Sequence, residues 1–428
     1  ATAAYQIEGA AREDGRGESI WDRFSHRPGA VANGDTGDVA CDHYHRWAED
    51  LDLMASLGLE SYRFSIAWPR VQPEGRGAFN PRGMAWYRRL VEGLLERGIE
   101  PVATLYHWDL PQARQEAGGW AVRDTAERFA EYAAAVAGAL GDVVEAWITH
   151  NEPWVVAFLG HAEGRKAPGI RDWPTALTVA HNLLLSHGLA VDALRSLVKT
   201  PVGITLNLNP MRGEPEPVAR MDAYQNRWFL DPVLRGTYPT ALLEHYEHVF
   251  GPLPGVNPED LDVISRPIDF LGVNYYNPTW VRASSTAWPL GAEPYTPRGH
   301  TTAMGWPVDA SGLHELLLRL RADYGDLQIW ITENGAAFDD ERLVDGVVED
   351  PSRVAFLRVH LAAVRAAIAD GVDVRRYHAW SLLDNFEWEH GYDKRFGIVR
   401  VDYATQERIP KRSALCYRDH IAATRREA

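Results

Sequence analysis

The chain contains 428 residues, of which 46% are hydrophobic and 24% are charged, and its formal net charge is −15. This composition is typical of a globular protein, and the negative charge disfavours nucleic acid or an anionic membrane as a partner, because both attract basic surfaces. The two cysteines, Cys41 and Cys416, lack the spacing of a zinc site, and no apolar run is long enough to span a bilayer. No leader is recognisable, so we expect a cytoplasmic protein, although the chain begins without Met and its N-terminus looks incomplete.

Apolar segments typical of β-strands alternate with amphipathic helical segments along the whole chain. Strands are predicted at residues 1–6, 61–66, 101–106, 146–151, 201–206, 270–275, 329–333 and 376–382. Helices are predicted at residues 44–57, 82–97, 125–140, 175–197, 239–248, 313–324, 353–370 and 413–424. Segments rich in Pro, Gly and Trp, such as residues 160–174 and 278–307, are predicted to be long loops.

About eight strands, each followed by a helix and with no flexible linker between them, predict a single α/β domain over residues 1–428. We expect a (β/α)8 TIM barrel whose first strand is cut short at its start. An open, doubly wound sheet is the alternative, but no Gly-x-Gly-x-x-Gly turn follows the first strand.

Two of the predicted strands run directly into a glutamate beside an asparagine. One ends in Asn151 and Glu152, and the other ends in Glu333 and Asn334. The carboxyl ends of all strands in a barrel meet at one mouth, so the two glutamates are expected to face each other. Two facing carboxylates are the minimum requirement for cleaving a glycosidic bond.

The ends of the other predicted strands also carry polar or aromatic residues. They are Gln6, Arg63, His107, Trp108, Asp109, Asn207, Asn274, Tyr275, Tyr276 and Trp380. Amide, imidazole and carboxyl groups can bind the hydroxyls of a sugar, and aromatic rings pack against its C–H faces. The sequence therefore predicts a sugar-binding site at the carboxyl ends of the strands.

Over essentially its whole length the chain resembles glycoside hydrolase family 1, the β-glucosidase family. The matching motifs are YQIEGA (residues 5–10), YRFSIAW (62–68), LYHWDLP (105–111), THNEP (149–153), NYY (274–276), ITENG (331–335) and WSLLDNFEW (380–388). The resemblance implies a retaining exo-β-glycosidase without metal or cofactor, above all a β-glucosidase. Its substrates would be the terminal β-D-glucosyl units of cello-oligosaccharides and of aryl or alkyl β-glucosides, with β-galactosidase or β-fucosidase side activity.

The resemblance also implies roles for individual residues. Glu333 would be the nucleophile and Glu152 the acid/base, with Arg63 and Tyr276 beside the nucleophile to stabilise its charge. The substrate-binding residues would be Gln6, His107, Trp108, Asn151, Asn274, Trp306, Trp380, Glu387, Trp388 and Phe396. A retaining mechanism needs the two carboxyl groups roughly 5–5.5 Å apart and an acid whose pKa is raised by burial and by its charged neighbour.

Two alternatives remain open at this point. A phospho-β-glucosidase would need a phosphate-binding cradle where this chain has Glu387 and Trp388, and a catalytically silent sugar-binding barrel would have lost one of the two glutamates. Lys166 stands where the family often has His, and His161 where Tyr is common, so we expect both to shape the entrance and product inhibition by glucose. The aglycone, the chain length of the substrate and the oligomeric state are left open.

Overall fold

The computed structural model describes residues 1–253, 255–340 and 342–427. Its central sheet has seven strands in the order β1-β2-β3-β4-β6-β9-β12, and every neighbouring pair is parallel. The strands are β1 (Ser61–Ser65), β2 (Glu100–Tyr106), β3 (Ala146–Asn151), β4 (Val202–Asn207), β6 (Phe270–Asn274), β9 (Ile329–Asn334) and β12 (Val374–Ala379). The bounds of all seven lie within three residues of those of a predicted strand.

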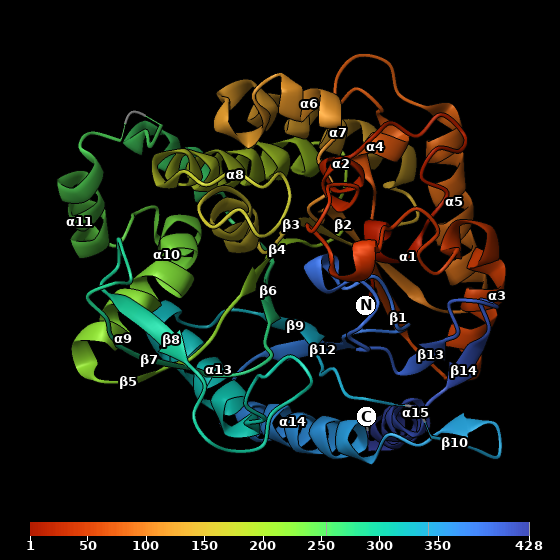
Figure 1. Ribbon diagram of the computed structural model, residues 1–428. Coiled ribbons are helices and arrows are strands. Elements are labelled where there is room, and N and C mark those ends of the chain that lie inside the picture. Colours follow the sequence, from red (N-terminus) through yellow and green to blue (C-terminus); the bar gives the residue numbers. More distant parts are fainter. Residues whose placement is uncertain (254, 341, 428) are drawn as a thin grey trace.

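Helices surround this sheet, as Figure 1 shows. The long ones are α3 (His43–Ser56), α5 (Pro81–Glu96), α7 (Arg123–Leu140), α8 (Trp173–Arg195), α11 (Thr240–Phe250), α13 (Ala310–Tyr324), α14 (Pro351–Ala369) and α15 (Arg412–Glu427). Shorter ones are α1 (Ala4–Ile7), α2 (Ile20–Ser25), α4 (Trp68–Val71), α6 (Gln112–Glu116), α9 (Pro215–Asp222), α10 (Trp228–Arg235) and α12 (Leu261–Ile264). Single turns are η1 (Ala32–Gly34), η2 (Gly119–Ala121), η3 (Val155–Leu159), η4 (Ala223–Arg227), η5 (Pro258–Asp260) and η6 (Trp388–His390).

Local sequence explains where the main elements begin and why they are buried. Every residue of β3 and of β9 is buried, as expected for strands covered by the barrel interior on one side and by helices on the other. The Asp172 and Asp309 side chains cap α8 and α13 by accepting hydrogen bonds from backbone N–H groups of the first turn. These caps define where the two helices begin.

The prediction of a strand at residues 1–6 is wrong, because α1 begins at Ala4. Only residues 1–3 precede this helix, and they lie between β12 and β1. The amino group of Ala1 donates to Ala379 O at 2.9 Å, and Thr2 N donates to Arg63 O at 2.9 Å. These residues thus occupy the eighth position and close the (β/α)8 barrel at the carboxyl end of its strands.

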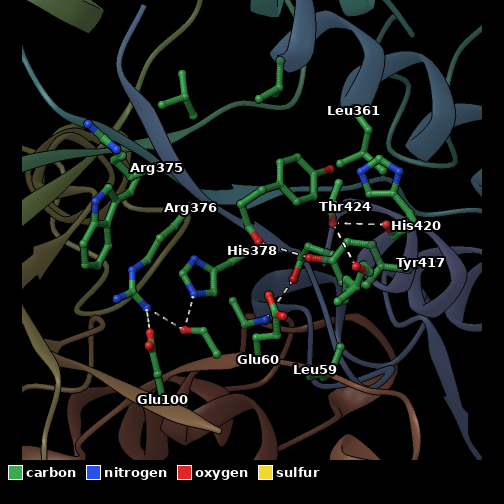
Figure 2. Close-up of a pocket in the computed structure, with 18 of the residues that line it drawn as sticks. Leu59, Glu60, Glu100, Leu361, Arg375, Arg376, His378, Tyr417, His420 and Thr424 are labelled. Atoms are coloured by element: carbon green, nitrogen blue, oxygen red, sulfur yellow. Dashed lines mark hydrogen bonds and ion pairs between the residues drawn. The ribbon is translucent and has the colours of Figure 1, made fainter. Parts of the chain in front are cut away.

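At the opposite end of the strands, the same gap between β12 and β1 contains a cavity of about 970 Å³. Figure 2 shows its lining, in which Arg376 donates to Glu100 and to Ser61 Oγ. His378 Nε2 lies 3.1 Å from Ser61 Oγ, so polar side chains connect β12 to β1 where the backbones do not pair. This cavity lies at the other end of the barrel from Glu152 and Glu333.

Three small sheets lie outside the barrel. One consists of β5 (Met211–Gly213), β7 (Thr279–Ala283) and β8 (Ala292–Tyr295), the second of β10 (Leu343–Val344) and β11 (Val347–Val348), and the third of β13 (Val399–Val401) and β14 (Arg408–Pro410). The prediction of a long loop over residues 278–307 is therefore wrong in part, because β7 and β8 pair there as an antiparallel hairpin. Among the described residues, none of the helices combines the length and apolar character that crossing a membrane would require.

Candidate active site

A cavity of about 760 Å³ opens at the carboxyl ends of the barrel strands, and both predicted glutamates line it. Glu333 belongs to β9 and Glu152 directly follows β3. Other predicted site residues that line the cavity are His107, Trp108, Tyr276, Trp306, Trp380, Glu387, Trp388 and Phe396. The remaining four, Gln6, Arg63, Asn151 and Asn274, lie behind this wall and hydrogen-bond to residues of it or next to it.

Glu333 accepts hydrogen bonds on both carboxyl oxygens. Arg63 Nη1 donates to Oε1 at 2.7 Å, and the Tyr276 hydroxyl donates to Oε2 at 2.6 Å. Burial, and then the charge of Glu333, raise the pKa of Tyr276 well above its ordinary value, so this hydroxyl keeps its proton. A guanidinium and a hydroxyl that both donate to one carboxylate stabilise its ionised form.

Glu152 is held by a neutral donor instead. Asn274 Nδ2 donates to Glu152 Oε1 at 2.7 Å, and the residue is only 6% exposed. Burial, and then the charge of Glu333, raise the pKa of Glu152 to about 8. At neutral pH Glu152 therefore carries a proton, so the two carboxyl groups of one cavity differ in charge.

Asn151 connects the surroundings of the two glutamates. Its Oδ1 accepts from Arg63 Nη2 at 2.6 Å and from Asn274 Nδ2 at 3.1 Å. Its Nδ2 lies 3.1 Å from His107 Nε2, and its carbonyl oxygen accepts from Trp108 Nε1 at 2.9 Å. Because the partners of both glutamates meet at Asn151, the two carboxyl groups are fixed relative to each other.

Two buried polar atoms near the cavity are free to bind a ligand. Among the described residues, neither His107 Nδ1 nor Gln6 Oε1 has a hydrogen-bond partner. Burial lowers the pKa of His107 well below its ordinary value, so the ring is neutral. With Nε2 accepting from Asn151, the proton of His107 sits on Nδ1. A free donor and a free acceptor suit the hydroxyls of a sugar.

Aromatic rings form much of the wall. The Trp108 and Trp388 ring centroids lie 4.5 Å apart, Trp380 stacks with His107 at 5.9 Å, and Tyr276 lies 5.2 Å from Trp306. These faces suit the C–H surface of a pyranose.

Lys166 lines the same cavity, and the sequence did not predict its partner there, Glu389. Its Nζ lies 2.5 Å from Glu389 Oε2 and 5.3 Å from the centre of the Trp108 ring, on the cavity wall. The nearby Glu387 has a pKa raised to about 8 by burial, an effect that Lys166 opposes. His161 does not share this location, because it is buried and bound through Nδ1 to Val156 O at 2.8 Å. The expected role of His161 in shaping the entrance therefore has no support in its position.

Three residues of the wall adopt the left-handed backbone conformation, which disfavours any residue with a side chain. They are Trp108 (φ 79°), Glu152 (φ 49°) and Trp388 (φ 49°). Such strain is characteristic of functional sites, where the surrounding structure holds a side chain in a required direction. Gly335, directly after Glu333 and Asn334, could not carry a side chain, because its Cβ would overlap the Trp380 carbonyl oxygen.

The barrel has a sugar-sized cavity with polar and aromatic walls, and two carboxyl groups that differ in charge line it. This combination defines a glycoside hydrolase. In the described part of the chain, no three His, Cys, Asp or Glu side chains are grouped so that they could hold a metal ion. The family is shown by comparison with known proteins: the chain belongs to glycosyl hydrolase family 1, whose profile matches residues 1–426.

Individual relatives agree with this assignment. The chain is 54% identical to thermostable beta-glucosidase B of Thermobispora bispora, over 98% of this chain and 88% of the relative. It is 48% identical to a bifunctional beta-D-glucosidase/beta-D-fucosidase of Bifidobacterium breve, over 99% and 96%. Its fold matches the family 1 β-glucosidase of Thermotoga maritima in complex with isofagomine lactam, with a TM-score of 0.94, 45% identity and coverage of 98% and 96%.

Proposed function

We propose that this protein is a retaining exo-β-glycosidase, above all a β-glucosidase, with Glu333 as the nucleophile and Glu152 as the acid/base. The observation that carries the proposal is the unlike environment of the two glutamates on one cavity. Glu333 accepts from Arg63 and Tyr276, whereas Glu152 has a pKa raised to about 8. A retaining mechanism needs one carboxylate and one carboxylic acid in this arrangement.

In the first step, a Glu333 oxygen attacks the anomeric carbon of the terminal sugar. The bond from that carbon to the leaving oxygen breaks, and Glu152 gives its proton to this oxygen, so that the leaving group departs as an alcohol. The products are a covalent glycosyl ester of Glu333 and an ionised Glu152. Arg63 and Tyr276 hold the attacking carboxylate in place before the step.

In the second step, Glu152 acts as a base. Once Glu333 is an ester it is neutral, so its charge no longer raises the pKa of Glu152. The ionised Glu152 takes a proton from a water molecule, whose oxygen attacks the anomeric carbon and releases Glu333 as a carboxylate. Sugar with retained configuration leaves, and the site returns to its starting charge.

The polar and aromatic residues around the glutamates bind the terminal sugar. We assign its hydroxyls to Gln6, His107, Asn151, Glu387 and the Trp388 indole, and its C–H face to Trp380, while Asn274 supports substrate binding through its hydrogen bond to Glu152. Trp108, Trp306 and Phe396 complete the wall. The free Nδ1 of His107 and the free Oε1 of Gln6 support this assignment. The names of the relatives support β-glucosidase activity with a β-fucosidase side activity.

The alternatives fit less well. A phospho-β-glucosidase would need basic and hydroxylic side chains to bind the phosphate, and this chain has Glu387 and Trp388 in their place. A silent barrel would lack one of the glutamates, and both are present on the cavity. We further propose that residues 1–428 act as one barrel domain in the cytoplasm, on β-glucosides or oligosaccharides.

Azide rescue of alanine variants tests the two roles. Glu333→Ala and Glu152→Ala should each reduce hydrolysis of an aryl β-glucoside by at least about 10³-fold. Azide added to Glu333→Ala should give the α-glycosyl azide, whereas azide added to Glu152→Ala should give the β-azide. Near-normal turnover by Glu333→Ala, or the same anomer from both variants, would overturn the assignment.

A further inference from the structure

The side-chain amide of Asn274 can face Glu152 with its nitrogen or with its oxygen, and the two orientations have opposite effects. An N–H group stabilises the ionised carboxylate, whereas an oxygen stabilises the carboxylic acid. In the structure the nitrogen, Nδ2, faces Glu152 and lies 2.7 Å from Oε1. The residues that fix this orientation therefore influence how readily Glu152 gives up its proton.

The nitrogen side of the amide is fixed from Arg63. A guanidinium only donates hydrogen bonds, so the Asn151 atom that lies 2.6 Å from Arg63 Nη2 is the acceptor Oδ1. The Asn274 atom that lies 3.1 Å from this oxygen must then be a donor, which is Nδ2. Asn274 thus directs its N–H group toward Asn151 and Glu152, and its oxygen is left to bind elsewhere.

Thr332, the residue directly before the nucleophile, holds the oxygen side. Its hydroxyl donates to Asn274 Oδ1 at 2.7 Å and accepts from the Thr205 hydroxyl at 3.2 Å. Thr332 and Thr205 are both 0% exposed, so bulk water cannot replace either bond. The three side chains, from β4, β9 and β6, form a buried chain of hydrogen bonds in which each hydroxyl proton has one direction.

The absence of a side chain at Gly272 makes this chain of hydrogen bonds possible. Strand β6 lies between β4 and β9 in the sheet, and Gly272 of β6 is in register with Thr205. A Cβ atom at Gly272 would lie 2.2 Å from Thr205 Oγ1 and 3.0 Å from Thr332 Cγ2. The glycine therefore leaves the space in which the hydroxyls of β4 and β9 meet across β6.

We propose that Thr332 is a positioning residue of the reaction: its hydroxyl, supported by Thr205, holds the Asn274 amide with the N–H group toward Glu152. This N–H group stabilises the carboxylate that Glu152 becomes in the first step and that takes a proton from water in the second. Thr332 does not line the cavity and acts through Asn274. The inference deepens the proposed function, because it rests on Glu152 as the acid/base.

Charged or titratable groups of the surrounding strands and loops also act on Glu152. They are Arg63, Lys166, Tyr276 and Glu333. Thr332→Val removes a neutral hydroxyl and leaves the charges of all these groups in place. A displaced pH profile in this variant therefore reports the orientation of the Asn274 amide.

The fall of kcat/KM at high pH measures the effect. In Thr332→Val the buried oxygen of Asn274 loses its donor, so the N–H group is no longer held toward Glu152 and the carboxylate is less stabilised. With an alkyl β-glucoside, the fall should therefore move to higher pH by about 0.5–1 pH unit. Thr332→Ser keeps the hydroxyl and should leave the fall in place. With a dinitrophenyl β-glucoside, whose leaving group needs no proton, Thr332→Val should change kcat/KM at neutral pH by less than about twofold.

Thr205→Val serves if Thr332→Val fails to fold. It removes the donor that supports the Thr332 hydroxyl, so it should move the fall in the same direction by a smaller amount.

Thr125 offers a matched control. It is also 0% exposed, and its hydroxyl also donates one hydrogen bond, to Gly119 O, and accepts another, from Arg114. It belongs to α7 and does not line the cavity. Thr125→Val should lower the midpoint of denaturant unfolding, as Thr332→Val does, without moving the fall of kcat/KM.

Coinciding pH profiles of Thr332→Val and the unaltered protein would overturn this inference, and so would an equal displacement in Thr332→Ser or in Thr125→Val. The azide products of Glu152→Ala and Glu333→Ala do not depend on Thr332, so the β-glucosidase proposal would stand in each of these cases. If the unaltered protein cleaves neither β-glucoside, the proposed function itself fails.

Discussion

The guanidinium of Arg63 and the carboxyl group of Glu333 form an ion pair of 2.7 Å, with side chains 0% and 4% exposed. Neither charge is in contact with bulk water, so each depends on the other for stabilisation. The pair joins β1 to β9 across the barrel interior. It therefore contributes both to the fold and to the ionised state of Glu333.

Removing one partner of this ion pair should lower the free energy of unfolding more than removing both. Arg63→Met should lower the free energy of unfolding by about 3–5 kcal/mol, because Glu333 is left as an unpaired buried charge. Arg63→Met/Glu333→Gln should be more stable than Arg63→Met alone. Denaturant unfolding of the four proteins of this cycle measures the difference, and strictly additive losses would show that the pair is not coupled.

The pH dependence of catalysis should reflect Glu152. The first step needs its protonated form, which persists up to a pKa of about 8. Measured against pH with an alkyl β-glucoside, kcat/KM should thus be retained at neutral pH and fall as pH rises through about 8. A dinitrophenyl glucoside, whose leaving group needs no proton, should show a weaker alkaline decline. An equally steep decline with both substrates would contradict the role of Glu152.

Lys166 should influence the alkaline limb of the pH profile, that is, the pH range in which kcat/KM falls. It lowers the pKa of Glu152 and of Glu387, and it is bound to Glu389 beside Arg165. Lys166→Met should therefore move the alkaline limb of kcat/KM to higher pH, whereas Lys166→Arg should leave it nearly in place. Identical profiles for the two variants would mean that Lys166 acts through packing alone.

A buried lysine near the C-terminal helix should matter for stability but not for chemistry. Lys411 Nζ binds Asp340 Oδ2 at 2.7 Å and Asp384 Oδ1 at 2.8 Å, and its side chain is 0% exposed. Lys411→Met should lower the free energy of unfolding by about 3–5 kcal/mol. Arg418, in an exposed pair with Asp419, is the control, and Arg418→Met should cost at most about 1 kcal/mol. Similar midpoints in a denaturant titration of both variants would contradict this expectation.

Much of the barrel follows from local patterns. Runs of Ile, Trp and Thr predicted β3 and β9, and the meeting of Glu152 and Glu333 at one mouth follows from the barrel rule alone. Residues 1–6 were predicted wrongly because their apolar side chains fit a strand and a helix equally well. What decides between them is the hydrogen bonding of residues 1–3 to β12 and β1, which no local pattern contains.

The finer chemistry of the site depends on contacts between distant segments. The pairing of Lys166 with Glu389 joins two segments far apart in the chain. Asn151 meets Arg63 of β1, His107 directly after β2 and Asn274 of β6. Burial also raises the pKa of Glu387 to about 8, which depends on the packed structure as a whole. Such contacts exist only in the folded barrel, so local sequence patterns cannot predict them.

The left-handed backbone at Trp108, Glu152 and Trp388 has an evolutionary consequence. Each such residue costs on the order of 1–3 kcal/mol of folding free energy. Mutagenesis selected only for heat resistance would therefore favour replacement of Glu152 by glycine, which relieves the strain but removes the acid/base. At Trp108 and Trp388 the strain stays, because removal of a buried indole would cost about 3–5 kcal/mol. The mouth of the barrel is thus where thermostability and turnover compete most directly, and a screen for more robust variants should leave these three positions unaltered.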